Sequence, residues 1–286
     1  MRTYRISAFA DEAGGALDVQ LAALKRNGIS QIEMRMVDGR NASHMTAAEA
    51  VAVRARLDAA GVTLSSLGSP FGKIFADEDF EPHYQQFLQG LKLCRILGAQ
   101  RMRVFSFYIP KGTAPGDWRG EVLRRLRRML DAADEWGIRL LHENEKGIYG
   151  DTAARCADLL DAFGGRLGCI FDPANFIQCG EKPLENFALL RERVEYMHIK
   201  DALLLDGSVV PAGKGDGSVA EILADMPGDG CMTLSIEPHL TVFDGLQTLQ
   251  TEILKQKYAY SDANEAFDAA AGALRGILAG LKREWR

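Results

Sequence analysis

The sequence predicts an α/β fold, a single (β/α)8 TIM barrel. Two observations predict it: apolar segments typical of strands alternate strictly with amphipathic segments typical of helices, and there are eight such units in 286 residues. Strict alternation implies parallel strands joined by helical crossovers, and eight units favour a closed barrel over an open sheet. A barrel of this kind needs about 250 residues. We therefore expect residues 1–286 to form one domain.

The predicted strands are short runs rich in apolar and β-branched residues, which favour pleated, buried positions. They are Tyr4–Phe9, Ile29–Met34, Val62–Leu67, Arg101–Phe107, Ile138–His142, Leu167–Phe171, Val194–Ile199 and Met232–Glu237.

The predicted helices place apolar residues at a spacing of three and four, which makes one buried stripe. They are Leu17–Arg26, Ala47–Ala60, Tyr84–Leu97, Trp118–Trp136, Thr152–Phe163, Asn186–Arg191 and Val219–Asp225. The basic run Arg124–Arg128 is interpreted as a solvated helix face. Residues 263–286 predict an extra C-terminal helix.

Nucleotide-binding open sheets are disfavoured by the glycine pattern. No G-x-G-x-x-G follows the first strand. The glycine-rich stretch Gly213–Gly217 does not fit a P-loop, because Ser208 stands where the first glycine is required and Gly215 stands where serine or threonine is required.

Bulk composition narrows the function classes. A net charge of −5 argues against a nucleic-acid binder, which needs a clustered basic face. The five cysteines form no C-x-x-C pair, which argues against zinc–thiolate sites and a disulfide framework. No signal peptide and no apolar run of membrane-spanning length is present. We expect a cytoplasmic protein with no membrane or nucleic-acid partner; the oligomeric state, including a homo-oligomer, stays open.

Four predicted strands end in a side chain that can bind a metal ion. These side chains are Glu143, Asp172, His198 and Glu237, on predicted strands five to eight, and they are separated by 29, 26 and 39 residues, about one βα unit each. Because active sites of such barrels lie at the C-terminal ends of the strands, we expect the four to form one divalent-metal site. Taken singly, an acid at a strand end is more often a helix N-cap or a surface charge than a metal ligand; Asp172 before Pro173 is typical of a turn or cap, and Glu237-Pro238 of a strand stop.

The predicted ligands favour a hard or borderline cation. Three carboxylates and one imidazole suit Mn²⁺, Mg²⁺ or Co²⁺, and Zn²⁺ is compatible with the same donors. A divalent cation would also offset the repulsion among three neighbouring carboxylates.

Other polar residues are candidates for substrate binding. Lys200 lies two residues after His198 and so points the same way; it holds a substrate oxygen or pairs with a site acid. Glu33 faces the barrel interior together with Arg35, as a structural pair or a substrate contact. Lys73 ends the polar loop after strand three, where it binds an anionic group or is solvated.

With these residues identified, the chain resembles the xylose isomerase-like TIM barrels, the sugar phosphate isomerase/epimerase group. That group includes inosose dehydratases, hydroxypyruvate isomerases, ketose 3-epimerases and endonuclease IV. The resemblance covers essentially the whole chain and is strongest in Leu141–Asn144, Phe171–Asn175, His198–Asp201 and Ser235–Pro238. It implies that Glu143, Asp172, His198 and Glu237 are metal ligands, and that Glu143 and Glu237 also transfer protons on opposite faces of the substrate.

Two positions distinguish subgroups within this family. Asn175 stands where ketose 3-epimerases usually have a substrate-contacting histidine, so the resemblance makes Asn175 a further candidate for substrate binding. Lys200-Asp201 follows His198 where those enzymes have an arginine nearby. The His-x-Lys-Asp ending is more similar to inosose dehydratases and hydroxypyruvate isomerases. Five histidines in an acidic chain do not favour endonuclease IV.

The expected function is a divalent-metal-dependent sugar isomerase or epimerase. It would act on a small polyhydroxylated carbonyl compound by proton transfer through an enediolate. The alternative is a metal-dependent dehydratase of an inosose-like keto-polyol, because the first half-reaction is shared. A second alternative is a barrel that binds a sugar or metal without chemistry.

Overall fold

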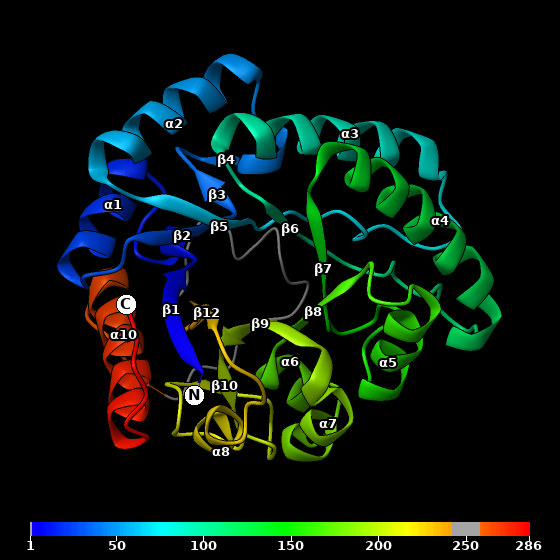
Figure 1. Ribbon diagram of the computed structural model, residues 1–286. Helices are drawn as coiled ribbons and strands as arrows, with labels where there is room; N and C mark the ends of the chain where they lie inside the picture. The colour runs from blue at the N-terminus through cyan, green and yellow to red at the C-terminus, as the bar shows by residue number, and fades with distance from the viewer. Residues whose placement is uncertain (1, 242–257) are drawn as a thin grey trace.

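Eight parallel strands form a nearly closed barrel surrounded by helices (Figure 1). The computed structural model describes residues 2–241 and 258–286. The barrel strands are β1 Thr3–Ala8, β2 Gln31–Met34, β5 Thr63–Leu67, β6 Arg101–Val104, β7 Arg139–Glu143, β8 Gly168–Phe171, β9 Val194–Ile199 and β12 Cys231–Ile236. All eight predicted strands are present, and the predicted TIM barrel is confirmed.

The strand order is β1-β12-β9-β8-β7-β6-β5-β2, so β1 and β2 are the ends of the hydrogen-bonded series. The outer side of β1 pairs with residues close to the C-terminus instead. The backbone N–H of Tyr4 donates to the carbonyl of Glu284 over 2.9 Å, and that of Ile6 donates to the carbonyl of Arg286 over 3.0 Å. The end of the chain therefore satisfies backbone groups at the barrel seam.

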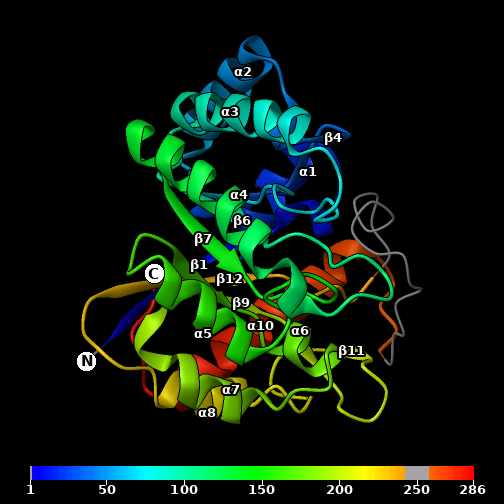
Figure 2. The same cartoon turned by 90° about the vertical axis from the view of Figure 1, so that its right-hand side faces the viewer.

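Helices cover the outside of the barrel, with α2 and α3 on one side and α7 and α8 on the opposite side (Figure 2). The helices are α1 Leu17–Arg26, α2 Ala47–Ala60, α3 Phe80–Leu97, α4 Pro115–Trp136, α5 Ala153–Ala162, α6 Pro173–Gln178, α7 Pro183–Leu190, α8 Val219–Ala224 and α10 Ala263–Gly280. Three 3₁₀ turns (Ala10–Glu12, Ala42–His44, Arg191–Arg193) and two small hairpins (β3 Met36–Val37 with β4 Arg40–Asn41; β10 Asp201–Ala202 with β11 Val209–Val210) complete the described elements. None of the helices in 2–241 and 258–286 is long and apolar enough to span a membrane.

The seven predicted helices are present, and α6 is an addition. Asp172 before Pro173 is typical of a turn or a cap, and in the structure Asp172 is the N-cap of α6: its Oδ1 accepts from the backbone N–H of Asn175 over 2.9 Å. Proline at the first helical position suits this start. The predicted C-terminal helix ends at Gly280, because the last residues extend along β1.

The basic run on α4 is not wholly solvated, which corrects the interpretation of Arg124–Arg128. Arg125 is buried and donates to the carbonyls of Phe75, Ala76 and Glu78 over 3.2, 2.8 and 2.7 Å. These carbonyls belong to the loop between β5 and α3, so the buried guanidinium ties this loop to α4.

The same loop is tied to the start of α3 and to β6. Gly72 has a φ of +97°, and a Cβ at this position would lie 2.1 Å from the carbonyl oxygen of Phe105. Its backbone N–H donates to Nε2 of His83 over 2.8 Å. Only an unprotonated Nε2 accepts this bond, so the fold requires neutral His83. Burial, together with the charge of Arg125, lowers the pKa of His83 to about 4.

We expect the free energy of unfolding to fall as the pH drops from about 6.5 to about 4, and His83 to account for part of this fall. In that range the unfolded chain protonates His83 and the folded chain does not, so stability is complete above pH 6.5 and lost below it. For this partly buried ring the loss is about 2 kcal/mol. His83→Gln should flatten the profile in urea titrations, and exposed His44→Gln should leave it unchanged. Parallel profiles for the His83 variant and the wild type would contradict the assignment.

Candidate metal centre

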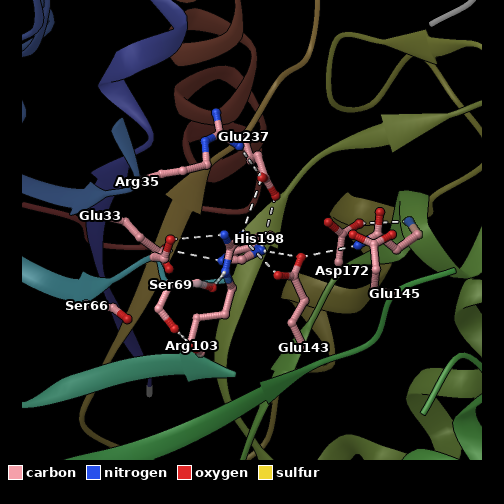
Figure 3. A network of polar contacts seen from close by, with 12 residues as sticks. Glu33, Arg35, Ser66, Ser69, Arg103, Glu143, Glu145, Asp172, His198 and Glu237 are labelled. Atoms are coloured by element: carbon pink, nitrogen blue, oxygen red, sulfur yellow. Dashed lines mark hydrogen bonds and ion pairs between the residues drawn. The ribbon is translucent and has the colours of Figure 1, made fainter. Parts of the chain in front are cut away.

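The structure brings the four predicted ligands together at one end of the barrel (Figure 3). Glu143 is the last residue of β7, Asp172 follows β8, His198 lies near the end of β9 and Glu237 follows β12. These strands are neighbours in the sheet, so their C-terminal ends meet. Each residue offers one ligand atom, all four atoms lie within 4.8 Å of one another, and all four residues are buried.

The contacts within this group suit a divalent cation. His198 Nδ1 lies 2.9 Å from Glu143 Oε1 and 3.2 Å from Glu237 Oε2. Among the described residues, the buried oxygens Asp172 Oδ2 and Glu237 Oε2 accept no hydrogen bond of normal geometry, and their partners are the charged groups of Lys200 and His198 at ion-pair distance. Buried carboxylate oxygens need a compensating partner, and three carboxylates with one imidazole match hard-to-borderline metals. The residues therefore fit the predicted metal site.

The three carboxylates differ in their protonation. Burial raises the pKa of Asp172 to about 7, although the ammonium of Lys200 opposes this effect. Burial also acts to raise the pKa of Glu143, but His198 and Arg103 outweigh it and lower the value to about 2. For Glu237 the opposing charges of Lys200 and His198 likewise lower the pKa. Glu143 and Glu237 are thus ionised at neutral pH and able to accept protons.

Two buried arginines hold the two glutamates. Arg103 Nη1 lies 3.0 Å from Glu143 Oε2, and Arg35 Nη1 lies 2.8 Å from Glu237 Oε1. Both guanidinium groups lie against the ring of Phe9, at 5.0 and 4.6 Å from its centroid. Sequence reasoning did not select Arg103; an arginine in the middle of a buried parallel strand was the available signal. Arg35 was noticed, but as a partner of Glu33.

Carboxylates outnumber bases in this buried network. Around the four ligands, the described part of the chain buries six carboxylates and three permanently basic side chains: Asp11, Glu12, Glu33, Glu143, Asp172 and Glu237 against Arg35, Arg103 and Lys200. Like charges at this spacing are costly in a low-dielectric interior. A divalent cation would bring the network closer to neutrality.

Two of the predicted substrate-binding residues lie next to the ligands. Lys200 Nζ is 2.9 Å from Asp172 Oδ2 and 3.6 Å from Glu237 Oε2. Asn175 Nδ2 donates to Glu143 Oε1 over 3.2 Å and to the carbonyl of Asn144 over 2.9 Å. Both side chains are buried and present N–H groups at the metal ligands.

The other two lie on different sides of the site. Lys73 is half-buried, pairs with Glu145 over 2.9 Å and lies over the ring of Phe105. Glu33 is completely buried, and its Oε2 lies 3.2 Å from His198 Nε2. Among the described residues it forms no hydrogen bond or ion pair with Lys73 or Asn175. Glu33 and Arg35 both face inward, but Arg35 pairs with Asp11, Glu12 and Glu237.

Comparison with known proteins supports the same architecture. Residues 21–254 match the family model described as "Xylose isomerase-like TIM barrel". A curated relative, the rhizopine catabolism protein MocC of Rhizobium meliloti, is 27% identical over 199 residues, which are 64% of this chain and 59% of that protein. The chain thus spans about 59% of the length of the relative that it matches.

Solved structures of low sequence identity share the fold over nearly the whole chain. The IolI protein with a bound zinc atom has a TM-score of 0.73 at 13% identity, covering 98% of this chain and 99% of that chain. An L-ribulose 3-epimerase has a TM-score of 0.73 at 17% identity, with 99% and 96% covered. A probable 3-DHS dehydratase, AsbF of Bacillus anthracis, has a TM-score of 0.71 at 16% identity, with 96% and 99% covered. Because the family model matches most of its length, the chain belongs to the xylose isomerase-like TIM barrel family.

Proposed function

We propose that this protein is a divalent-metal-dependent sugar isomerase or epimerase. One observation carries the proposal: Glu143 and Glu237, both ionised, approach His198 Nδ1 from β7 and β12 and share one candidate cation site. A protein that only binds a metal needs no pair of proton acceptors at this spacing. The epimerase and dehydratase activities named for similar folds agree with this chemistry.

The proposed reaction moves a proton next to a carbonyl group. When bound, Mn²⁺, Mg²⁺, Co²⁺ or Zn²⁺ would act as a Lewis acid that makes the α C–H of the substrate more acidic. Glu143 or Glu237 takes the α-proton, giving an enediolate, and the other glutamate returns a proton. Arg103 and Arg35 fix the orientation of these two carboxylates, and their burial keeps bulk water away from the reacting carbon.

The proposed substrate is a small polyhydroxylated carbonyl compound. Lys200 and Asn175 supply buried N–H donors for its oxygens beside the ligands. Lys73, at the rim, would contact its far end by exchanging Glu145 for a substrate oxygen. All five cysteines are free, which supports action in the cytoplasm.

A dehydratase is the second candidate, and the place of Lys200 favours it. Its ammonium lies 3.6 Å from Glu237 Oε2, close enough to the proposed base to protonate a departing β-hydroxyl after the α-proton is removed. The hydroxyl then leaves as water instead of the α-carbon being reprotonated.

The test combines metal loading with a substrate panel. The chelator-treated protein is loaded with Mn²⁺, Mg²⁺, Co²⁺ or Zn²⁺ and incubated in D₂O with ketoses, aldoses and inososes, and the products are analysed by NMR and mass spectrometry. An isomer carrying deuterium at the α-carbon supports the isomerase or epimerase, and loss of one water supports the dehydratase. Tight metal binding with neither exchange nor turnover across the panel would favour the barrel without chemistry.

A further inference from the structure

Glu33 lies in direct contact with the candidate metal ligand His198. It occupies the third position of β2, and its side chain is completely buried. Its Oε2 is 3.2 Å from His198 Nε2 and accepts a hydrogen bond from Tyr196 Oη over 2.8 Å. The contact with His198 joins β2 to β9 through the interior of the barrel (Figure 3).

The two ring nitrogens of His198 face different partners. Nδ1 faces Glu143 Oε1 and Glu237 Oε2 within the group of candidate ligands, and in the described part of the chain Nε2 faces the carboxylate of Glu33. A neutral imidazole has one N–H and one lone pair, and the partner of one nitrogen decides which nitrogen carries the hydrogen. A carboxylate only accepts hydrogen bonds, so a hydrogen on Nε2 is the arrangement that Glu33 stabilises.

We propose that Glu33 is a positioning residue: it holds the hydrogen of His198 on Nε2 and so presents the Nδ1 lone pair to the metal. This inference rests on the metal site of the proposed function and replaces a substrate contact as the role of Glu33. A carboxylate behind a histidine ligand also makes that ligand more basic and fixes the plane of its ring.

Glu33 also contacts a buried group of hydroxyls. Tyr196 donates its hydroxyl hydrogen to Glu33, and Tyr196 Oη lies 2.9 Å from Ser65 Oγ. Ser65 in turn donates to the carbonyl of Ile32 over 3.1 Å, and its Oγ lies 2.7 Å from Ser7 Oγ. Of these three hydroxyls, the one that orients the Glu33 carboxylate is therefore that of Tyr196.

Packing restricts the imidazole from its faces as well as its edges. The rings of Phe9 and Tyr196 lie edge-on to that of His198, with centroid distances of 5.2 and 5.8 Å and interplanar angles of 78° and 86°. Because these contacts restrict the ring plane, the hydrogen bond to Glu33 determines which nitrogen binds the metal.

Glu33→Gln is the decisive substitution, because it keeps the shape and can present an amide N–H to Nε2. We expect Zn²⁺ affinity, measured by calorimetric titration, to fall by about 10- to 100-fold. In ¹⁵N-NMR spectra of the Zn²⁺-free protein, Nε2 of His198 should carry a hydrogen in the wild type and lose it in Glu33→Gln. Ser65→Ala is the matched control: it removes a buried polar group from the same group of hydroxyls but leaves Glu33, so its Zn²⁺ affinity should stay within about threefold of wild type.

Several results would overturn the proposal. One is a Glu33→Gln protein with wild-type Zn²⁺ affinity and hydrogen still on Nε2; another is an equal loss of affinity in Ser65→Ala. If Glu33→Gln does not fold, the Zn²⁺-loaded wild type decides, because zinc on Nε2 of His198 contradicts the inference and zinc on Nδ1 with hydrogen on Nε2 supports it. If the wild type binds no Zn²⁺, the proposed metal-dependent function fails separately, and the tautomer of His198 still tests the role of Glu33.

Discussion

Replacing Glu237 with glutamine is expected to lower kcat by about 10³-fold or more. General acid–base catalysis by one positioned group contributes about 10²- to 10⁴-fold, and the amide cannot take a proton from the substrate. Glutamine has one oxygen for Arg35 and the cation together, so kcat is compared at saturating metal concentration, and KM should change much less than kcat. Arg35 keeps Asp11 and Glu12 as partners, which limits the loss of stability.

Two comparisons make this prediction specific. Glu143→Gln should have an effect of the same size, and the double variant should be little worse than either single variant, because groups that act as one unit are not additive. Glu195→Gln, at the opposite end of β9, pairs with Arg139 outside the site and should keep wild-type kcat. A Glu237→Gln enzyme with near-normal kcat, measured with the substrate found in the panel, would rule out the scheme with two carboxylates.

The fold and the convergence of the four candidate ligands could be predicted because they depend on periodic features. Alternating strand and helix patterns fix a parallel barrel, and a parallel barrel places every strand end at the same rim. Knowing only that Glu143 and Asp172 follow successive strands is therefore enough to expect them in one place. The short helix α6 was missed because six residues carry too little periodicity, and its cap, Asp172, was already assigned to the metal.

The network behind the ligands could not be predicted in the same way. Arg103 and Arg35 reach glutamates on β7 and after β12, and pairs of this kind depend on side-chain length and rotamer more than on strand parity. The alternation of side chains along β2 predicts that Glu33 and Arg35 both face the barrel interior. It does not predict which partners they contact: Arg35 pairs with Asp11 and Glu12, and Glu33 contacts His198. Where eight strands converge, the ion-pair partner of a side chain is therefore often not the opposite charge nearest to it in sequence.

Adding a divalent metal should raise the free energy of unfolding, and Asp172→Asn should remove most of this increase. A ligand that binds only the folded state stabilises it by about 2.7 kcal/mol at a free concentration 100-fold above its Kd. For a chain of this size that amounts to a rise in Tm of about 5 °C or more. Asparagine keeps an oxygen to cap α6, as Asp172 Oδ1 does now, but it loses the charge of the buried Oδ2.

The prediction concerns the rise in Tm when metal is added, not the Tm of the metal-free protein. Lys200 loses its closest carboxylate in Asp172→Asn, so the variant starts from a lower stability even without metal. Thermal scans of chelator-treated and Mn²⁺-loaded protein should show a clear difference for wild type and for the surface control Asp158→Asn, but almost none for Asp172→Asn. If the Asp172 variant gains as much from Mn²⁺ as the wild type, the cation binds elsewhere, and the four strand-end residues would be a salt-bridged network instead of a metal centre.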